Sequence, residues 1–160
     1  MPVRLPAALA AALAVALALA ACTGKPGTAV GSRSTADLNL YPNETAELRS
    51  LIRTYAGSYG VPEDLVQRVV IRESRHFPSA RNGPYYGLMQ ILPATARTMG
   101  YEGSPEGLLD AETNLKYGVK YLRGAWLVAG GNRDKAVGWY AKGYYYEAKR
   151  KGLLEETGLR

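Results

Sequence analysis

The feature that most constrains the fold of this chain is a regular apolar stripe in its second half. Five apolar residues recur there at spacings of four, three, four and three: Leu115, Val119, Leu122, Trp126 and Ala129. An α-helix brings residues at such spacings onto one face, so the stripe predicts one long core helix over residues 111–129. Asp110 is placed to cap its first turn, and the glycine pair after residue 129 is placed to end it.

Shorter helices are expected on both sides of this long helix. We expect helices over residues 42–60, 62–77, 93–99 and 132–143, and a short helical turn from residue 104. The signals are helical spacing of apolar residues, or a Pro, Asn or Gly at the end of a segment. Between these helices, Asn82-Gly83-Pro84 is a strong turn signal in a loop. No stretch of useful length alternates as a strand would, and no internal repeat is present. The sequence therefore predicts an all-α domain over residues 41–160, a bundle of short helices around one long core helix with little or no β-structure.

One of the short helices carries an acid where its apolar stripe would continue. The apolar face of this helix is formed by Leu65, Val66, Val69 and Val70. Glu73 lies on the same face, although burying an unpaired carboxylate is costly. In one interpretation the helix is only structural, and Glu73 pairs with a nearby arginine, namely Arg68, Arg72 or Arg75. In the other, Glu73 ends the stripe at the wall of a cleft, where desolvation keeps it protonated as a general acid.

The first 40 residues are expected to lie outside the folded domain. Arg4 and the apolar run that extends to residue 21 are typical of an export signal, predicted over residues 1–21 and removed on export. The Leu-Ala-Ala-Cys that ends at Cys22 resembles the bacterial lipobox, so we expect Cys22 to be lipidated and to become the new amino terminus. Residues 22–40 are rich in Gly, Ser, Thr and Pro and predict a flexible tether.

The composition excludes several classes of function. With one cysteine and one histidine, the chain has no set of residues at metal-ligand spacing, so neither a metal nor another cofactor is expected. The formal net charge of +6 suits an anionic polymer or a membrane surface, and it is equally compatible with solubility alone. Nucleic acid is not expected as a partner, because an exported protein is in the wrong compartment and no basic-aromatic binding motif is present.

Two short motifs follow each other in the middle of the chain, and further matching residues lie beyond them. Glu73-Ser74 is followed by Gly87-Leu88-Met89-Gln90 and then by Pro93-Ala94-Thr95-Ala96. The agreement continues at Asn114, Gly118, Tyr121, Leu122, Tyr140 and Gly143. In this order and spacing, the residues resemble the catalytic domain of the SLT-type lytic transglycosylases, relatives of goose-type lysozyme. The resemblance spans residues 61–146 and implies a lysozyme-like helical bundle with a substrate cleft.

The resemblance implies an enzyme that acts on the bacterial cell wall. Family members cleave the β-1,4 bond between N-acetylmuramic acid (MurNAc) and N-acetylglucosamine (GlcNAc) in peptidoglycan strands. Glu73 would be the single general acid and base, protonating the leaving oxygen and later deprotonating the C6 hydroxyl. That hydroxyl attacks C1 and gives a 1,6-anhydroMurNAc end without water. Glycosidases that activate water use two carboxylates, and no second acid is matched here, since Asp110 and Glu112 are expected to serve the start of the long helix.

The resemblance also assigns residues to the substrate. Ser74, Met89 and Gln90 would lie at the sugar cleft, and Tyr140 would reach towards the catalytic acid and orient its carboxyl group. Without the resemblance, Met89 and Tyr140 would be expected in the core, and Ser74 would be a solvated hydroxyl at the helix end. Ala141 stands where the family usually has asparagine. One side-chain amide hydrogen bond is therefore missing or supplied elsewhere.

Other chemically suggestive residues have more than one interpretation. His76 stands three residues after Glu73, but we expect this lone histidine to make a helix-end contact and not to take part in catalysis. Tyrosines such as those at 144–146 could stack on sugar faces, although most are expected to be packing residues. The basic run at 149–151 is expected to face solvent, and it could also touch the carboxylates of stem peptides or anionic lipid.

Two alternatives to a lytic transglycosylase remain open. A hydrolytic muramidase on the same fold would leave reducing ends, and a non-catalytic peptidoglycan-binding lipoprotein would keep the cleft without turnover. Peptidoglycan strands are the expected partner in each case, and nothing in the chain identifies a partner in an envelope assembly. The expected location is the cell envelope, with a lipid anchor at Cys22. Thr23, in place of an aspartate that would retain a lipoprotein at the inner membrane, favours the outer membrane facing the periplasm.

Overall fold

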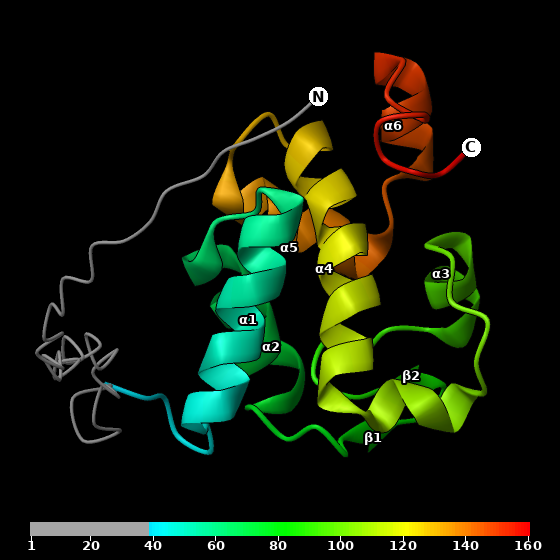
Figure 1. Cartoon of the computed structure of the whole chain (residues 1–160). Coiled ribbons are helices and arrows are strands. Elements are labelled where there is room, and N and C mark those ends of the chain that lie inside the picture. Colours follow the sequence, from blue (N-terminus) through cyan, green and yellow to red (C-terminus); the bar gives the residue numbers. More distant parts are fainter. Residues whose placement is uncertain (1–38) are drawn as a thin grey trace, which may run out of the picture. The chain divides into compact units, whose positions relative to one another are not determined.

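The long helix expected from the apolar stripe is α4, Ala111–Val128, and it lies at the centre of the domain (Figure 1). The structure is a computed structural model, and it describes residues 39–160. The side chain of Asp110 accepts a hydrogen bond from the backbone N–H of Thr113, which confirms the predicted N-cap. Leu115, Val119 and Leu122 are fully buried, so the predicted apolar face is the core face.

Four further helices pack around α4 or against its neighbours. α1 (Ala46–Tyr59), α3 (Pro93–Thr98) and α5 (Arg133–Lys142) contact α4, and α2 (Glu63–Ser74) packs against α1 and α5. The apolar faces of α1, α2, α4 and α5 meet in one core. A short 3₁₀ helix, Pro105–Leu109, leads into α4. This arrangement confirms a mainly helical domain around one long helix.

A small hairpin forms where the sequence predicts a loop with a turn. β1 (Arg81–Asn82) pairs antiparallel with β2 (Tyr85–Tyr86), and the predicted Gly-Pro turn joins them. Tyr86 of β2 belongs to a second apolar cluster, which also comprises Ile91, Ala96, Tyr101 and Leu108. Each strand has two residues, which is too short for an alternating pattern to be visible in the sequence.

The ends of two helices differ from the sequence-based expectation. α1 begins at Ala46 and not at residue 42, because Thr45 caps it through the N–H of Leu48 and Asn43 has a φ of 65°. α2 ends at Ser74 and not at residue 77, because the next two residues, Arg75 and His76, have φ values of 53° and 65°. Both turns place non-glycine residues in the left-handed region, which no simple sequence pattern indicates.

The last helix, α6 (Tyr145–Lys151), was not expected from the sequence. It is anchored by Tyr144, which is almost fully buried and donates a hydrogen bond from its hydroxyl to the carbonyl oxygen of Tyr121 in α4. Apart from Ala148, the helix exposes or only partly buries its side chains, so it has no apolar stripe. Its position is set by a tertiary contact of its N-cap residue.

The expected export signal (1–21), the lipidated Cys22 and residues 23–38 of the tether lie outside the described residues. Within residues 39–160, no helix is both long enough and apolar enough to cross a membrane.

Candidate active site

A groove lies between the end of α2, the hairpin and the end of α5. It consists of two adjoining cavities of about 310 Å³ each, and four residues line both: Tyr85, Gln90, Tyr140 and Ala141. One cavity is also lined by Arg72 and Glu73, and the other is also lined by Thr95 and Tyr121. The groove is therefore assembled from segments that are far apart in the sequence.

Glu73 sits on the last turn of α2, where the helix reaches the groove. Its side chain is 22% exposed, and the Nε of Arg72 lies 3.5 Å from its Oε1. Burial raises the pKa of the Glu73 carboxyl above its ordinary value, and the nearby charge of Arg72 opposes this shift. Arg68 pairs with Asp134 at 2.6 Å instead. The net effect keeps the carboxyl protonated to a higher pH than a solvated glutamate, as a general acid requires.

The groove contains a single acidic side chain. Among the described residues that line its two cavities, Glu73 is the only carboxylate. The other two acids that the sequence placed near the long helix are engaged there. Asp110 caps α4, and Glu112 accepts a hydrogen bond of 3.0 Å from the hydroxyl of Tyr55.

Tyr140 lines both cavities beside Glu73, with its ring edge-on to that of Tyr121 at 5.4 Å. Its hydroxyl donates a 2.8 Å hydrogen bond to the carbonyl oxygen of Met89, and not to the Glu73 carboxyl. Burial, with a contribution from the charge of Glu73, holds the pKa of Tyr140 well above its usual range. The phenol is therefore neutral, and its direct partner is the backbone of the facing loop.

Met89 and Ser74 take positions different from those that the family resemblance implied. The Met89 side chain is fully buried, and a Cβ added at Gly118 would come within 2.6 Å of its sulfur. The buried Ser74 hydroxyl donates to the carbonyl oxygen of Val70 at 3.2 Å. Neither side chain lines the groove, so Met89 contributes through its backbone and Ser74 through helix packing.

Gln90 lies in the groove wall in a left-handed conformation, with a φ of 47°. Its side-chain amide nitrogen donates to the carbonyl oxygens of Ala80 and Gly87, at 3.0 and 2.9 Å. Its Oε1 is buried and has no hydrogen-bond partner among the described residues. Because the Gln90 N–H groups hold the loop, they do not replace the amide that Ala141 lacks.

Asn114 holds the loop that contributes Tyr85 and Gln90 to the groove wall, a role that sequence reasoning did not assign to it. This side chain on α4 is fully buried; its Oδ1 accepts from the N–H of Met89 at 2.8 Å. Its Nδ2 donates to the carbonyl oxygens of Tyr86 and Leu108, at 2.8 and 2.7 Å. Gly87 makes this approach feasible, since a Cβ there would come within 2.3 Å of the amide. A polar residue next to the apolar stripe of the long helix was the available signal.

His76 belongs to a buried polar cluster outside the groove, which agrees with a helix-end contact. Its Nε2 lies 2.8 Å from the Oε1 of Gln67, whose amide nitrogen donates to Glu44 at 2.6 Å. Because a carboxylate only accepts, the Gln67 oxygen faces His76 and receives the Nε2–H. Burial lowers the pKa of His76. The imidazole is thus committed to the link between α2 and the segment before α1.

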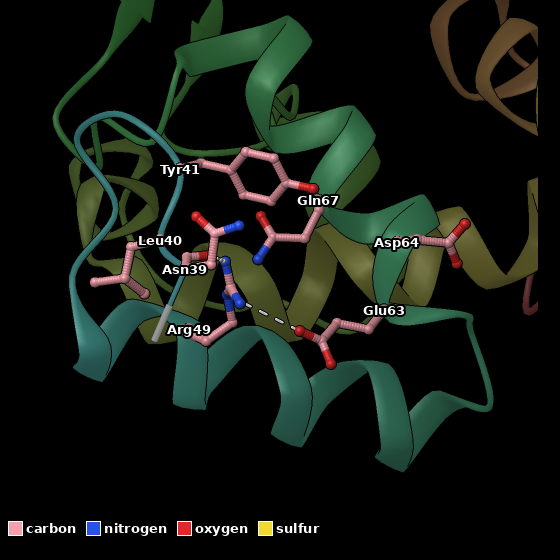
Figure 2. Close-up of a pocket in the computed structure, with 7 residues that line it drawn as sticks. All are labelled: Asn39, Leu40, Tyr41, Arg49, Glu63, Asp64 and Gln67. Carbon is pink, nitrogen blue, oxygen red and sulfur yellow. Dashed lines mark hydrogen bonds and ion pairs between the residues drawn. The ribbon is translucent and has the colours of Figure 1, made fainter. Parts of the chain in front are cut away.

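Arg49 completes this cluster at the edge of a second pocket. Figure 2 shows the side chains of Arg49, from α1, and Gln67, from α2, converging beside the segment 39–41. The Nε of Arg49 donates to Glu44 at 2.6 Å. Hydrogen bonds from Arg49 and Gln67 outweigh the burial of Glu44 and lower its pKa to about 2. This pocket shares no lining residue with the groove.

The described residues contain no group of three or more His, Cys, Asp or Glu side chains that could hold a metal ion. What the groove offers is one desolvated acid beside buried and half-buried aromatic rings. Such an arrangement suits the transfer of a proton to a substrate that stacks on aromatic side chains.

Comparison with known proteins gives a consistent match. Residues 50–155 match the transglycosylase SLT domain. The soluble lytic murein transglycosylase of Escherichia coli (strain K12) is 33% identical over 91 residues, which cover 52% of this chain and 14% of the relative. The membrane-bound lytic murein transglycosylase E of Buchnera aphidicola subsp. Acyrthosiphon pisum (strain APS) is 34% identical over 88 residues, which cover 50% of this chain and 40% of the relative. The chain thus aligns with less than half the length of these relatives.

Proposed function

The chain belongs to the transglycosylase SLT domain family, and from this membership we propose that it is a peptidoglycan lytic transglycosylase. Its substrate would be the MurNAc-β-1,4-GlcNAc bond of glycan strands, and its product would carry a 1,6-anhydroMurNAc end. The names of the two relatives, both murein transglycosylases, support the substrate class.

The observation that carries this proposal is that, among residues 39–160, Glu73 is the only acidic side chain that lines the groove. Hydrolytic glycosidases usually place a second carboxylate across the scissile bond, either as a nucleophile or as the base that activates water. A reaction in which the substrate supplies its own nucleophile needs only one carboxyl group. The raised pKa of Glu73 makes the protonated form available for the first step.

The proposed reaction balances with this single residue. Protonated Glu73 gives its proton to the glycosidic oxygen, the bond from C1 to that oxygen breaks, and GlcNAc leaves with a free 4-hydroxyl. The resulting carboxylate stabilises the positive charge that develops at C1. The C6 hydroxyl of MurNAc then attacks C1 and returns its proton to Glu73, so no water is consumed.

Tyr140 and its partners would act as the frame of this site. Its hydroxyl binds the Met89 carbonyl oxygen, and Asn114 binds the Met89 N–H, so the loop that carries Gln90 is fixed from two helices. Gln90 and Ala141 would contact the sugar at the junction of the two cavities. Because Ala141 lacks the side-chain amide of the asparagine usual in the family, we infer that aromatic side chains such as Tyr85 orient the substrate.

We also propose that the protein works in the cell envelope, attached by lipid at Cys22 to the outer membrane and facing the periplasm. The support is the lipobox-like tetrapeptide and the membrane-bound designation of one relative. A tether over residues 22–40 would let the domain reach the glycan strands while the lipid stays in the membrane.

The proposal is tested by digesting purified peptidoglycan with the full chain and identifying the products by mass spectrometry. We expect anhydro-muropeptides from the wild type and none from Glu73→Gln, which keeps the shape of the side chain but cannot donate a proton. Glu112→Gln, an acid outside the groove, is the matched control and should retain turnover. Reducing ends would assign a hydrolase, and binding without any product would assign a peptidoglycan-binding protein.

A further inference from the structure

A second aromatic surface lies just beyond the end of the groove, where α5 passes into α6. The cavity there has a volume of about 410 Å³, and its lining includes Trp139, Lys142, Tyr145, Tyr146 and Arg150. We call the residues that line this cavity, together with Lys149 on α6, the α6 surface. Tyr146 is 84% exposed and Tyr145 is 47% exposed, with their rings edge to face at 5.4 Å. Two neighbouring tyrosines so exposed are available for a ligand.

The position of these two rings is fixed by the residue before them. Tyr144 packs its hydroxyl end against Gly124, where an added Cβ would come within 2.2 Å of it. The hydroxyl also donates a 2.8 Å hydrogen bond to the carbonyl oxygen of Tyr121. Because Tyr144 is locked into the core, the next two side chains are held outward on a rigid support.

The charge of this surface is positive after its internal ion pair is taken into account. Arg150 pairs with Glu147 at 2.7 Å, which cancels one charge of each sign. Lys142 forms no ion pair in residues 39–160, and its Nζ lies 4.0 Å from the centre of the Trp139 ring. Lys149, four residues after Tyr145 on α6, is also exposed and forms no ion pair in the same region. Lys142, over the Trp139 ring, and Lys149, one helical turn after Tyr145, thus have no carboxylate partner in residues 39–160.

The α6 surface is continuous with the groove, because Lys142 and Gly143 line the cavities of both. A polymer leaving the groove past Gly143 would therefore reach the exposed rings and the lysines. Glycan strands of peptidoglycan carry short stem peptides, whose free carboxylates complement uncompensated ammonium groups. Their aliphatic parts and the sugar faces suit tyrosine rings.

We propose that the α6 surface binds the stem peptide of the glycan strand in the groove and makes the enzyme prefer peptide-bearing strands over bare glycan. This inference rests on the proposed function. The competing occupant is an anionic membrane surface. α6 has seven residues and no apolar stripe, whereas helices that lie in a membrane interface are usually longer and bury an apolar face. Continuity with the groove therefore favours the stem peptide.

The experiment compares kcat/KM of the full chain on two substrates, intact glycan strands and the same strands after amidase has removed the stem peptides. We expect the wild type to favour the peptide-bearing strands by about fivefold, the scale of one stacking contact and one exposed charge pair. The double variant Tyr146→Ala with Lys149→Gln should bring this ratio close to one. Lys116→Gln is the control for the loss of one exposed lysine, since Lys116 is exposed like Lys149 but lines none of these cavities. Its ratio should equal that of the wild type.

A binding measurement separates this inference from the proposed function. The free stem tetrapeptide is titrated into labelled full chain while the indole N–H resonance of Trp139 is followed by NMR. A saturable shift in the wild type, weakened in the double variant, supports the inference even if neither substrate is cleaved. Equal ratios in wild type and double variant, no shift with the tetrapeptide, or binding only to phosphatidylglycerol vesicles would each overturn it.

Discussion

Glu73 combines two opposing influences, because burial favours its neutral form and Arg72 favours its charged form. Arg72→Gln removes the second influence, so the pKa of Glu73 should rise further. Since the protonated carboxyl starts the reaction, the alkaline limb of the kcat profile should move to higher pH, by a few tenths of a unit for a partly solvated ion pair. Arg68→Gln, one turn earlier and paired with Asp134, should leave the limb in place. A shift of the Arg72 variant to lower pH would contradict this account.

Glu44 makes stability depend on acid pH. Its pKa is lowered from 4.5 to about 2 in the folded protein. A lowered carboxyl pKa gives stability that is present above the unfolded value and is lost as pH falls, here from about 5 towards 2. The loss should be on the order of 3 kcal/mol in the free energy of unfolding, measured by urea denaturation across this range. Glu44→Gln should be less stable at pH 7 and should lose this part of the pH dependence, and an unchanged pH profile in that variant would refute the assignment.

At the residue scale, the sequence predicted which residue is the candidate acid better than it predicted where neighbouring side chains point. Glu73 could be singled out because an acid on an apolar face is unusual, and the structure places it in the groove with a raised pKa. Met89 and Ser74 came from motif adjacency alone. Whether a side chain next to an active residue points into a cleft or into the core depends on backbone turns such as those at residues 75, 76 and 90, which no periodicity encodes.

Two helical glycines differ sharply in what surrounds them, and this contrast gives a prediction for helix packing. At Gly118 in α4, an added Cβ would come within 2.6 Å of the Met89 sulfur, so Gly118→Ala should destabilise the fold by about 1–3 kcal/mol. At Gly138 in α5, an added Cβ meets nothing within 4 Å, so Gly138→Ala should stabilise by about 0.5–1 kcal/mol through helix propensity. Thermal or urea unfolding measures both, and equal effects would mean that the contact with Met89 does not limit packing.

At the scale of elements, predictability followed the source of each element's stability. α4 and α5 were predicted with their caps, because Asp110 and Asn132 bind the backbone N–H groups of their own first turns. These are local interactions that a sequence displays directly. α6 was missed because its anchor is the contact of Tyr144 with α4, more than twenty residues away. The hairpin was missed as strands because each strand has only two residues, and its support comes from a tertiary contact, the packing of Tyr86 in the second apolar cluster.

At the scale of the whole molecule, the proposed lipid anchor depends on one thiol, that of Cys22, which lies outside the described residues. Cys22→Ser should abolish lipid attachment, because no other cysteine is available to form the thioether. The variant should then partition into the aqueous phase of a detergent extract, or keep its signal uncleaved. Intact-mass measurement of both forms distinguishes these results. A variant that still carries lipid would exclude the lipobox assignment.

The shape of the whole site could not be predicted from the sequence, for a geometric reason. Each wall of the groove comes from a different segment, and the junction of its two cavities joins Tyr85 and Gln90 to Tyr140 and Ala141. Helix periodicity gives the inner face of each segment but not the angles at which segments meet. The family resemblance named Glu73, Gln90 and Tyr140, which line the groove, and also Ser74 and Met89, which do not. The shape of the groove and its continuation towards α6 required the structure.

The way in which the loop 80–91 is held has a consequence for how this protein can change over evolutionary time. Asn114, Tyr140 and the Gln90 amide all grip main-chain atoms of this loop, at residues 80, 86, 87 and 89. The exposed side chains of Asn82 and Tyr85 line the groove and make none of these hydrogen bonds. Mutation can therefore sample new surface chemistry at these two positions while the loop keeps its course. Substitutions at these two positions can therefore change substrate specificity with little effect on folding.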